Sequence, residues 1–177
     1  MKILIPKITL VLILCSIAFG QYTGSVKTAR MYEIQKNWDA AISIYNDILS
    51  KSPNNYQVVR SLKNVYRISQ RYGDGINFLT YQLSRNPKDI QFSIDLGEFY
   101  FLDEKVNEAK KIWADGLILF QNNRSYYRLL FSTYDKYSLS EQLFQMVQKG
   151  RKEFNSSFLS IELGNYYQKR NQFKKAI

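Results

Sequence analysis

The sequence predicts an all-α protein built from repeated pairs of helices. Helix-forming and aromatic residues dominate its 177 positions, whereas glycine (8) and proline (3) are scarce, which argues against a turn-rich β-sandwich. With 45% hydrophobic residues, the chain is too apolar to be disordered. The third observation is internal repetition with a period of about 34 residues, because periods of roughly 20 to 50 residues indicate solenoid architectures.

Residues 1–20 have the three regions of a secretory signal peptide: a basic start, an apolar run and a small-residue end. We expect cleavage between Gly20 and Gln21. The apolar stretch at 8–19 is shorter than the roughly 20 residues that a membrane-spanning helix needs. A retained anchor and a lipoprotein modified at Cys15 are the alternatives. Removal of the signal leaves a chain without cysteine, which suits an oxidising compartment.

Tyrosines mark the repeat unit, because Tyr32, Tyr66, Tyr100 and Tyr134 recur at one constant interval. A small residue lies nine positions after each of the first three tyrosines, where two helices approach closely, and a bulky residue follows four positions later. The small residues are Ala41, Gly75 and Ala109, and the bulky residues are Tyr45, Leu79 and Trp113. Removing the signal leaves a domain at 21–177 with four repeats near 22–55, 56–89, 90–123 and 124–156 and an incomplete fifth at 157–177.

Each repeat is expected to form two amphipathic helices, as the unit at 56–89 illustrates. Its apolar residues follow the spacing of three and four that marks one face of a helix. They are Val59, Leu62, Val65 and Tyr66 in the first helix and Ile76, Leu79 and Leu83 in the second. We expect Gly73 to end the first helix and Asp74 to cap the second. The corresponding break at 138–141 has the sequence of a capping box.

The combination of period and motif resembles the tetratricopeptide repeat. Units of that family carry Leu-Gly-x-x-Tyr in the first helix, then a small residue and a bulky residue in the second. The third unit supplies Leu96, Gly97, Tyr100, Ala109 and Trp113. The resemblance runs from about residue 22 to the end and is weakest in the fourth unit. It implies a right-handed superhelical solenoid of antiparallel helix pairs whose first helices line a concave groove.

The sequence stops early in the fifth unit, at most one turn into its second helix. Repeat arrays need a polar terminal helix to cover their last apolar face. We therefore expect a fragment of a longer protein, with room for a further domain beyond Ile177.

The composition carries no signature of catalysis. Histidine is absent and the single cysteine lies in the signal, so the commonest general base and the commonest metal ligands are missing. The acidic pair Asp103 and Glu104 precedes a predicted helix, where acids complement the helix dipole. The glycines are scattered and form no phosphate-binding loop. We expect no enzymatic activity, no cofactor and no metal.

If the first helices line a groove, the residues on its floor are those that lie two and five positions before and after each motif leucine. Arginine and asparagine on one helix can bind peptide carboxylates and amides. Arg60 and Asn64 resemble half of the carboxylate clamp of some tetratricopeptide domains, although Glu98 stands where that clamp continues with asparagine. The candidate groove residues are Arg30, Gln57, Arg60, Asn64, Arg67, Gln91, Glu98, Arg128, Asn165 and Gln168. The same offsets select Glu33, Ile94, Phe101, Ser125, Ser132, Asp135, Phe158 and Ile161.

The net charge of +10 falls to +8 when the two signal lysines are removed, and residues 136–177 carry +5 of it. Such a basic end can contact anionic lipid, polysaccharide or nucleic acid, and the alternative is a solvated helical surface. The repeat period and the export signal both argue against nucleic acid, because RNA-binding pentatricopeptide arrays have a period one residue longer and act inside cells.

These features predict an exported bacterial protein, periplasmic or associated with the cell envelope. We expect a non-catalytic scaffold, monomeric by itself, that binds a partner protein or peptide in its groove. The alternative is the targeting or regulatory arm of a larger enzyme or envelope-assembly protein whose working domain lies beyond Ile177.

Overall fold

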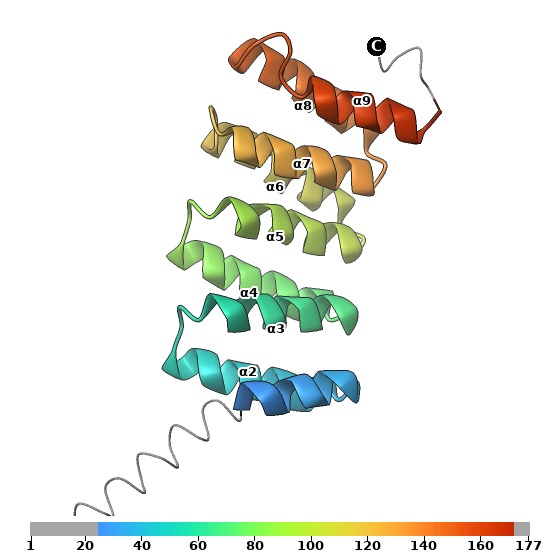
Figure 1. Ribbon diagram of the computed structural model, residues 1–177. Coiled ribbons are helices and arrows are strands. Elements are labelled where there is room, and N and C mark those ends of the chain that lie inside the picture. Colours follow the sequence, from blue (N-terminus) through green and yellow to red (C-terminus); the bar gives the residue numbers. More distant parts are fainter. Residues whose placement is uncertain (1–24, 172–177) are drawn as a thin grey trace, which may run out of the picture. The chain divides into compact units, whose positions relative to one another are not determined.

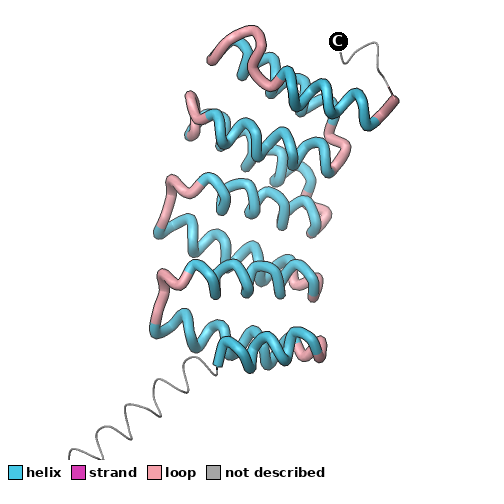
Figure 2. Tube along the Cα trace, in the orientation of Figure 1, coloured by secondary structure: helices cyan, strands magenta, loops and turns pink. Residues whose placement is uncertain are grey.

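The computed structural model describes residues 25–171, in which every regular element is an α-helix (Figures 1 and 2). Residues 25–34 are helical, and eight labelled helices follow. Their bounds are α2 Trp38–Lys51, α3 Tyr56–Ile68, α4 Tyr72–Arg85, α5 Ile90–Leu102, α6 Val106–Leu119, α7 Arg124–Lys136, α8 Ser140–Glu153 and α9 Ser160–Lys169. The all-α prediction is confirmed. The predicted signal peptide and the chain after residue 171 lie outside the described residues.

The chain divides into two compact units, the first ending at Arg71 and the second beginning at Tyr72. In the first unit, α2 packs on α3. In the second unit, the helices from α4 to α9 stack in chain order (Figure 1). There α5 contacts α4, α6 and α7, and α7 packs on α8. The contact between α5 and α7 places first helices of consecutive repeats side by side.

Small and bulky residues occupy the helix contacts as predicted. Ala41, Gly75 and Ala109 are buried, and the side chains of Tyr45, Leu79 and Trp113 are fully enclosed. In the fourth unit, Leu143 and Val147 occupy the corresponding positions and are also buried. This divergent unit therefore fills the same space with aliphatic side chains.

A residue in the left-handed backbone conformation recurs between the two helices of successive repeats. Lys36, Gln70, Glu104 and Ser138 have φ angles of 57°, 59°, 61° and 57°, and each lies one repeat period after the one before it. Such angles usually favour glycine, because a Cβ atom is strained there. None of the four is glycine, so the sequence gives no sign of this turn.

Two predicted helix boundaries are wrong for this reason. The first helix of the second repeat ends at Ile68, and Gly73 and Asp74 lie in the first turn of α4 rather than between helices. At 138–141 no capping box forms, because α8 begins after Leu139 without a side-chain cap. The hydroxyl of Ser140 instead contacts that of Tyr166 at 2.7 Å.

Side-chain caps precede three of the first helices, α3, α5 and α7. Asn55, Asp89 and Asn123, which also lie one repeat period apart, accept hydrogen bonds from the first-turn amides of α3, α5 and α7. An N-cap of this kind satisfies amides that have no partner within the helix. The caps thereby fix where these three helices begin, and with it which of their residues lie on the binding face. No helix among residues 25–171 is both long and apolar enough to cross a membrane.

Candidate partner-binding site

A hollow of about 760 Å³ lies on the first unit, between the helix at 25–34 and α3. One side of α3 is apolar and buried, and its other side supplies polar residues at spacings of three and four. The residues that line the hollow are Arg30, Tyr56, Gln57, Arg60, Ser61, Lys63, Asn64 and Arg67. The structure thus brings together all five candidates predicted from the first two repeats.

The lining of this hollow is cationic. Of the described residues that form it, four are Lys or Arg and none is acidic. The three acids between residues 25 and 71 are engaged elsewhere: Glu33 with the Tyr45 hydroxyl, Asp39 with Arg71 at 2.6 Å, and Asp47 with Lys51 at 2.8 Å. The described residues that line the hollow therefore include no carboxylate.

Tyr45 binds one of these acids, Glu33, within the first unit. Its ring is fully buried, and its hydroxyl donates a hydrogen bond to the Glu33 carboxylate. Burial, and then the hydrogen bond to Glu33, raise the pKa of Tyr45 to about 12. Glu33, although selected by the groove offsets, serves this internal contact.

Alkaline pH is expected to destabilise the fold through this tyrosine. The unfolded chain ionises tyrosine near pH 10, whereas folded Tyr45 keeps its proton until about pH 12, so the free energy of unfolding should fall as pH rises between these values. Urea unfolding at pH 8, 10 and 11 measures the slope. Tyr45→Phe should be less stable at pH 8 but less sensitive above pH 10, whereas Tyr56→Phe, at an exposed position, should keep the native slope. Equal slopes in all three proteins would contradict the assignment.

Other side chains cover most of the α5 face on which groove residues were predicted. Ile94 and Glu98 are only 3% and 7% exposed, and the ring of Phe101 packs at a tilt against Tyr137 with 4.4 Å between centroids. Glu98 accepts hydrogen bonds from Lys136 at 3.0 Å and from the Tyr137 hydroxyl at 3.4 Å. The end of α7 therefore covers Glu98 and Phe101 on α5. Gln91 stays exposed at the start of α5 and donates to Asp95 at 3.1 Å.

Lys136 supplies the cation in the contact between α5 and the end of α7. Partial burial lowers its pKa, but the hydrogen bonds to Glu98 and Tyr137 and the charge of Glu98 outweigh that effect, and the pKa is raised. Lys136→Ala should lower the free energy of unfolding by about 1–2 kcal/mol, because it removes a cation that pairs with an enclosed carboxylate. Urea unfolding monitored by circular dichroism measures this loss. Arg128→Ala, which removes a more exposed pair with Glu162, should cost about 0.5 kcal/mol or less. Equal losses would contradict the role of burial.

Ion pairs also link α7 to α9. Arg128 pairs with Glu162 at 3.0 Å, and Asp135 pairs with Arg170 at 2.8 Å and with Lys169 at 3.6 Å. A hollow of about 360 Å³ beside these pairs includes Asn165, whose side chain is exposed, as is that of Gln168. Phe158, selected by the same offsets, is buried in the core. On this part of the face, opposite charges largely neutralise one another.

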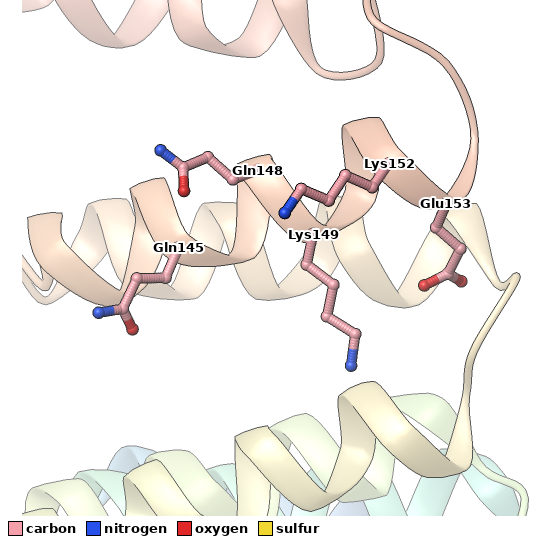
Figure 3. A pocket seen from close by; sticks show the side chains of 5 residues that line it. All are labelled: Gln145, Gln148, Lys149, Lys152 and Glu153. Atoms are coloured by element: carbon pink, nitrogen blue, oxygen red, sulfur yellow. The ribbon is translucent and has the colours of Figure 1, made fainter.

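A further hollow of about 450 Å³ lies on α8, a second helix (Figure 3). Its Lys149 extends towards α6 and donates to the carbonyl of Leu117 at 3.2 Å. Glu153 accepts from the hydroxyl of Tyr127 at 2.7 Å. Both charged groups hold α8 against its neighbours.

In residues 25–171, no cluster of three or more His, Cys, Asp or Glu could bind a metal ion.

Some residues at these sites were not selected from the sequence. Tyr56, Ser61 and Lys63 also line the hollow on the first unit. The sequence analysis missed them because it considered only four offset positions in each first helix. Lys63 could have been predicted from the sequence, since it lies three residues after Arg60 and residues at that spacing are neighbours on a helix surface. Lys136 and Tyr137 could not have been predicted as part of the site, because their contact with α5 depends on how two repeats pack.

The fold is a helical-repeat solenoid like that of solved tetratricopeptide-repeat proteins. The solved structure of MamA shares 18% identity with a TM-score of 0.50, covering 89% of this chain and 86% of that one. The thermophilic tetratricopeptide protein TTC0263 of Thermus thermophilus matches at 11% identity and a TM-score of 0.52, over 88% and 86% of the two chains. A tetratricopeptide-repeat protein of Parabacteroides merdae matches at 14% identity and 0.53, over 88% of this chain and 62% of that one. No family model and no curated protein sequence matches significantly. At such identities the likeness establishes the solenoid fold.

Proposed function

We propose that the protein is a non-catalytic scaffold that is exported to the bacterial periplasm or cell envelope and binds a partner protein or peptide through its first helices. The observation that carries this proposal is the hollow on the first unit, where exposed Arg30, Gln57, Arg60 and Asn64 offer charged and amide groups. Arginine forks and asparagine amides match the carboxylates and backbone amides of a peptide. Tetratricopeptide arrays are generally interaction modules, which supports a scaffold rather than an enzyme.

Site-directed photo-crosslinking in the organism's own cells tests where the partner binds. A photoreactive phenylalanine analogue replaces Gln57 in the hollow or, as the matched control, Gln148 on α8; both glutamines are exposed. We expect a defined crosslinked species from position 57 that mass spectrometry identifies as one partner. Crosslinks of equal yield at both positions, or none at position 57, would contradict binding in the hollow.

Export has its own test. Signal cleavage predicts that the protein in the periplasmic or envelope fraction begins at Gln21, which intact-mass measurement detects. A full-length chain that stays in the cytoplasm would contradict export and leave the binding experiment unaffected.

A further inference from the structure

Three large apolar side chains are exposed on the second helices of the second unit. Tyr81 lies in the last five residues of α4, and Ile118 and Leu119 are the last two residues of α6. The other large apolar side chains that are exposed in residues 25–171 belong to first helices, and they are Met31, Ile34, Tyr56, Ile68 and Ile161. The ends of α4 and α6 thus carry an apolar surface of their own, away from the predicted groove.

The repeat shows that the pair Ile118 and Leu119 departs from the pattern. The corresponding final residues are Ser50-Lys51 in α2, Ser84-Arg85 in α4 and Lys152-Glu153 in α8. Equivalent residues of a repeat array have equivalent surroundings, so a solvated polar pair is expected at this position. Single exposed apolar residues are common, but these are two adjacent aliphatic side chains that are 67% and 61% exposed. They suit contact with an apolar environment.

Cations surround this pair. Lys149 of α8 donates to the carbonyl of Leu117 at 3.2 Å, which places its ammonium group beside the last turn of α6. The Arg85 guanidinium lies over the ring of Tyr81, 5.9 Å from its centroid, and Lys152 is exposed at the end of α8. The carboxyl ends of α4, α6 and α8 lie on one side of the second unit, at the left in Figure 1. With Tyr81 and the Ile-Leu pair, these cations form one surface, the second-helix surface.

Positive charge predominates on this surface. The last five residues of α4, α6 and α8 contain four Lys or Arg and two Asp or Glu. Of the two acids, Asp115 is exposed, whereas Glu153 accepts from the Tyr127 hydroxyl at 2.7 Å. The surface is therefore complementary to a negatively charged partner.

The basic residues 136–177, from which the sequence predicts membrane contact, contribute only in part. Lys136, Lys169 and Arg170 pair with carboxylates of neighbouring helices on the first-helix side. Lys149 and Lys152 lie on the second-helix surface instead. The apolar pair on α6 was missed because it lies before this basic segment.

The chemistry of the surface matches a bilayer interface better than a protein. Tyrosine rings favour the headgroup level, and Arg and Lys extend their charges to lipid phosphates while their stems cover apolar surface. A stable protein partner or a second copy of the chain would bury about 800 Å² on each side, with an apolar centre. Three exposed large apolar side chains at two helix ends cover much less than that.

We infer that the second-helix surface binds an anionic lipid bilayer, with Ile118 and Leu119 entering the headgroup region and Arg85, Lys149 and Lys152 contacting lipid phosphates. Such a contact is peripheral, because it uses the ends of helices and spans nothing. It involves none of the residues that line the hollow of the first unit, so it is independent of the proposed partner binding.

Photo-crosslinking to vesicles locates the contact. A photoreactive phenylalanine analogue replaces Ile118 in the full chain or, as the matched control, Ile161, which is 78% exposed on the first helix α9. With vesicles of phosphatidylcholine and about 30% phosphatidylglycerol, we expect at least about fivefold more protein–phospholipid adduct from position 118, measured by intact mass. Every variant carries the same residues 1–20, so any lipid contact of that segment is common to both.

Charge-matched variants test the cations, with the photoreactive residue kept at position 118. Arg85→Gln/Lys152→Gln should lower the adduct yield at least about threefold, because two contacts with anionic lipid are lost. Lys27→Gln/Lys36→Gln, at exposed positions of the first unit, removes the same charge and should change the yield by less than about 1.5-fold. Circular dichroism confirms that both variants fold.

Three results would overturn the inference. The first is an equal adduct yield from positions 118 and 161. The second is an undiminished yield from position 118 when the vesicles contain phosphatidylcholine alone. The third is a crosslink from position 118 to a second copy of the chain, in place of lipid, as the main product. In each case the crosslinking result at position 57 still decides the scaffold proposal separately.

Discussion

Trp113→Ala is expected to lower the free energy of unfolding by about 3–5 kcal/mol, the range for truncating a large enclosed aromatic side chain. The indole is completely buried, and its Nε1 donates to the carbonyl of Ile94 at 3.2 Å. Its ring meets that of Tyr134 edge-on at 5.5 Å, so the indole contacts both α5 and α7. The substitution therefore opens a cavity where three helices meet.

Urea unfolding followed by far-ultraviolet circular dichroism measures this loss. Trp113→Phe, which keeps most of the volume but lacks the indole donor, should cost less, about 1–2 kcal/mol. Ile118→Ala, at a position that is 67% exposed on the same helix, should stay within about 0.5 kcal/mol of the native protein. Hydrogen exchange should accelerate most in α5, α6 and α7. A loss below about 1 kcal/mol for Trp113→Ala would show that the site collapses to fill the cavity.

The sequence was sufficient to predict this core position. Tyr45, Leu79 and Trp113 follow one another at the repeat period, and repetition forces equivalent residues into equivalent surroundings, so one motif reports burial in several units. The turns were not predictable in the same way. Their left-handed positions hold Lys36, Gln70, Glu104 and Ser138, which the helices on either side impose without a glycine to mark them.

The binding face shows where sequence reasoning reaches its limit. Offsets from the motif leucine correctly identified side chains that share one face of α3, because helical periodicity alone determines that face. They also selected Glu98 and Ile94, which are enclosed in the structure. The end of α7 covers Glu98, and contact between helices of consecutive repeats depends on packing angles that no single repeat encodes.

Gly116→Ala is expected to destabilise the protein by about 2–3 kcal/mol, although alanine is ordinarily the better helix former. A Cβ atom at Gly116 would overlap the phenol oxygen and ring of Tyr126. That ring cannot simply move aside, because it is fully buried, its hydroxyl donates to the carbonyl of Trp113 at 3.1 Å, and it packs against Phe120 with 4.8 Å between centroids.

A double-mutant cycle, measured by urea unfolding, identifies Tyr126 as the cause. Tyr126→Phe alone loses a buried hydrogen bond and should cost about 1 kcal/mol. In the Gly116→Ala/Tyr126→Phe protein part of the overlap is gone, so its total loss should be smaller than the sum of the two single losses by at least about 1 kcal/mol. Gly73→Ala is the control: no atom lies within 4 Å of the added Cβ, and the substitution should be neutral or stabilising by up to about 1 kcal/mol. Additive losses would mean that the new methyl group is accommodated by a shift of α6 rather than resisted by Tyr126.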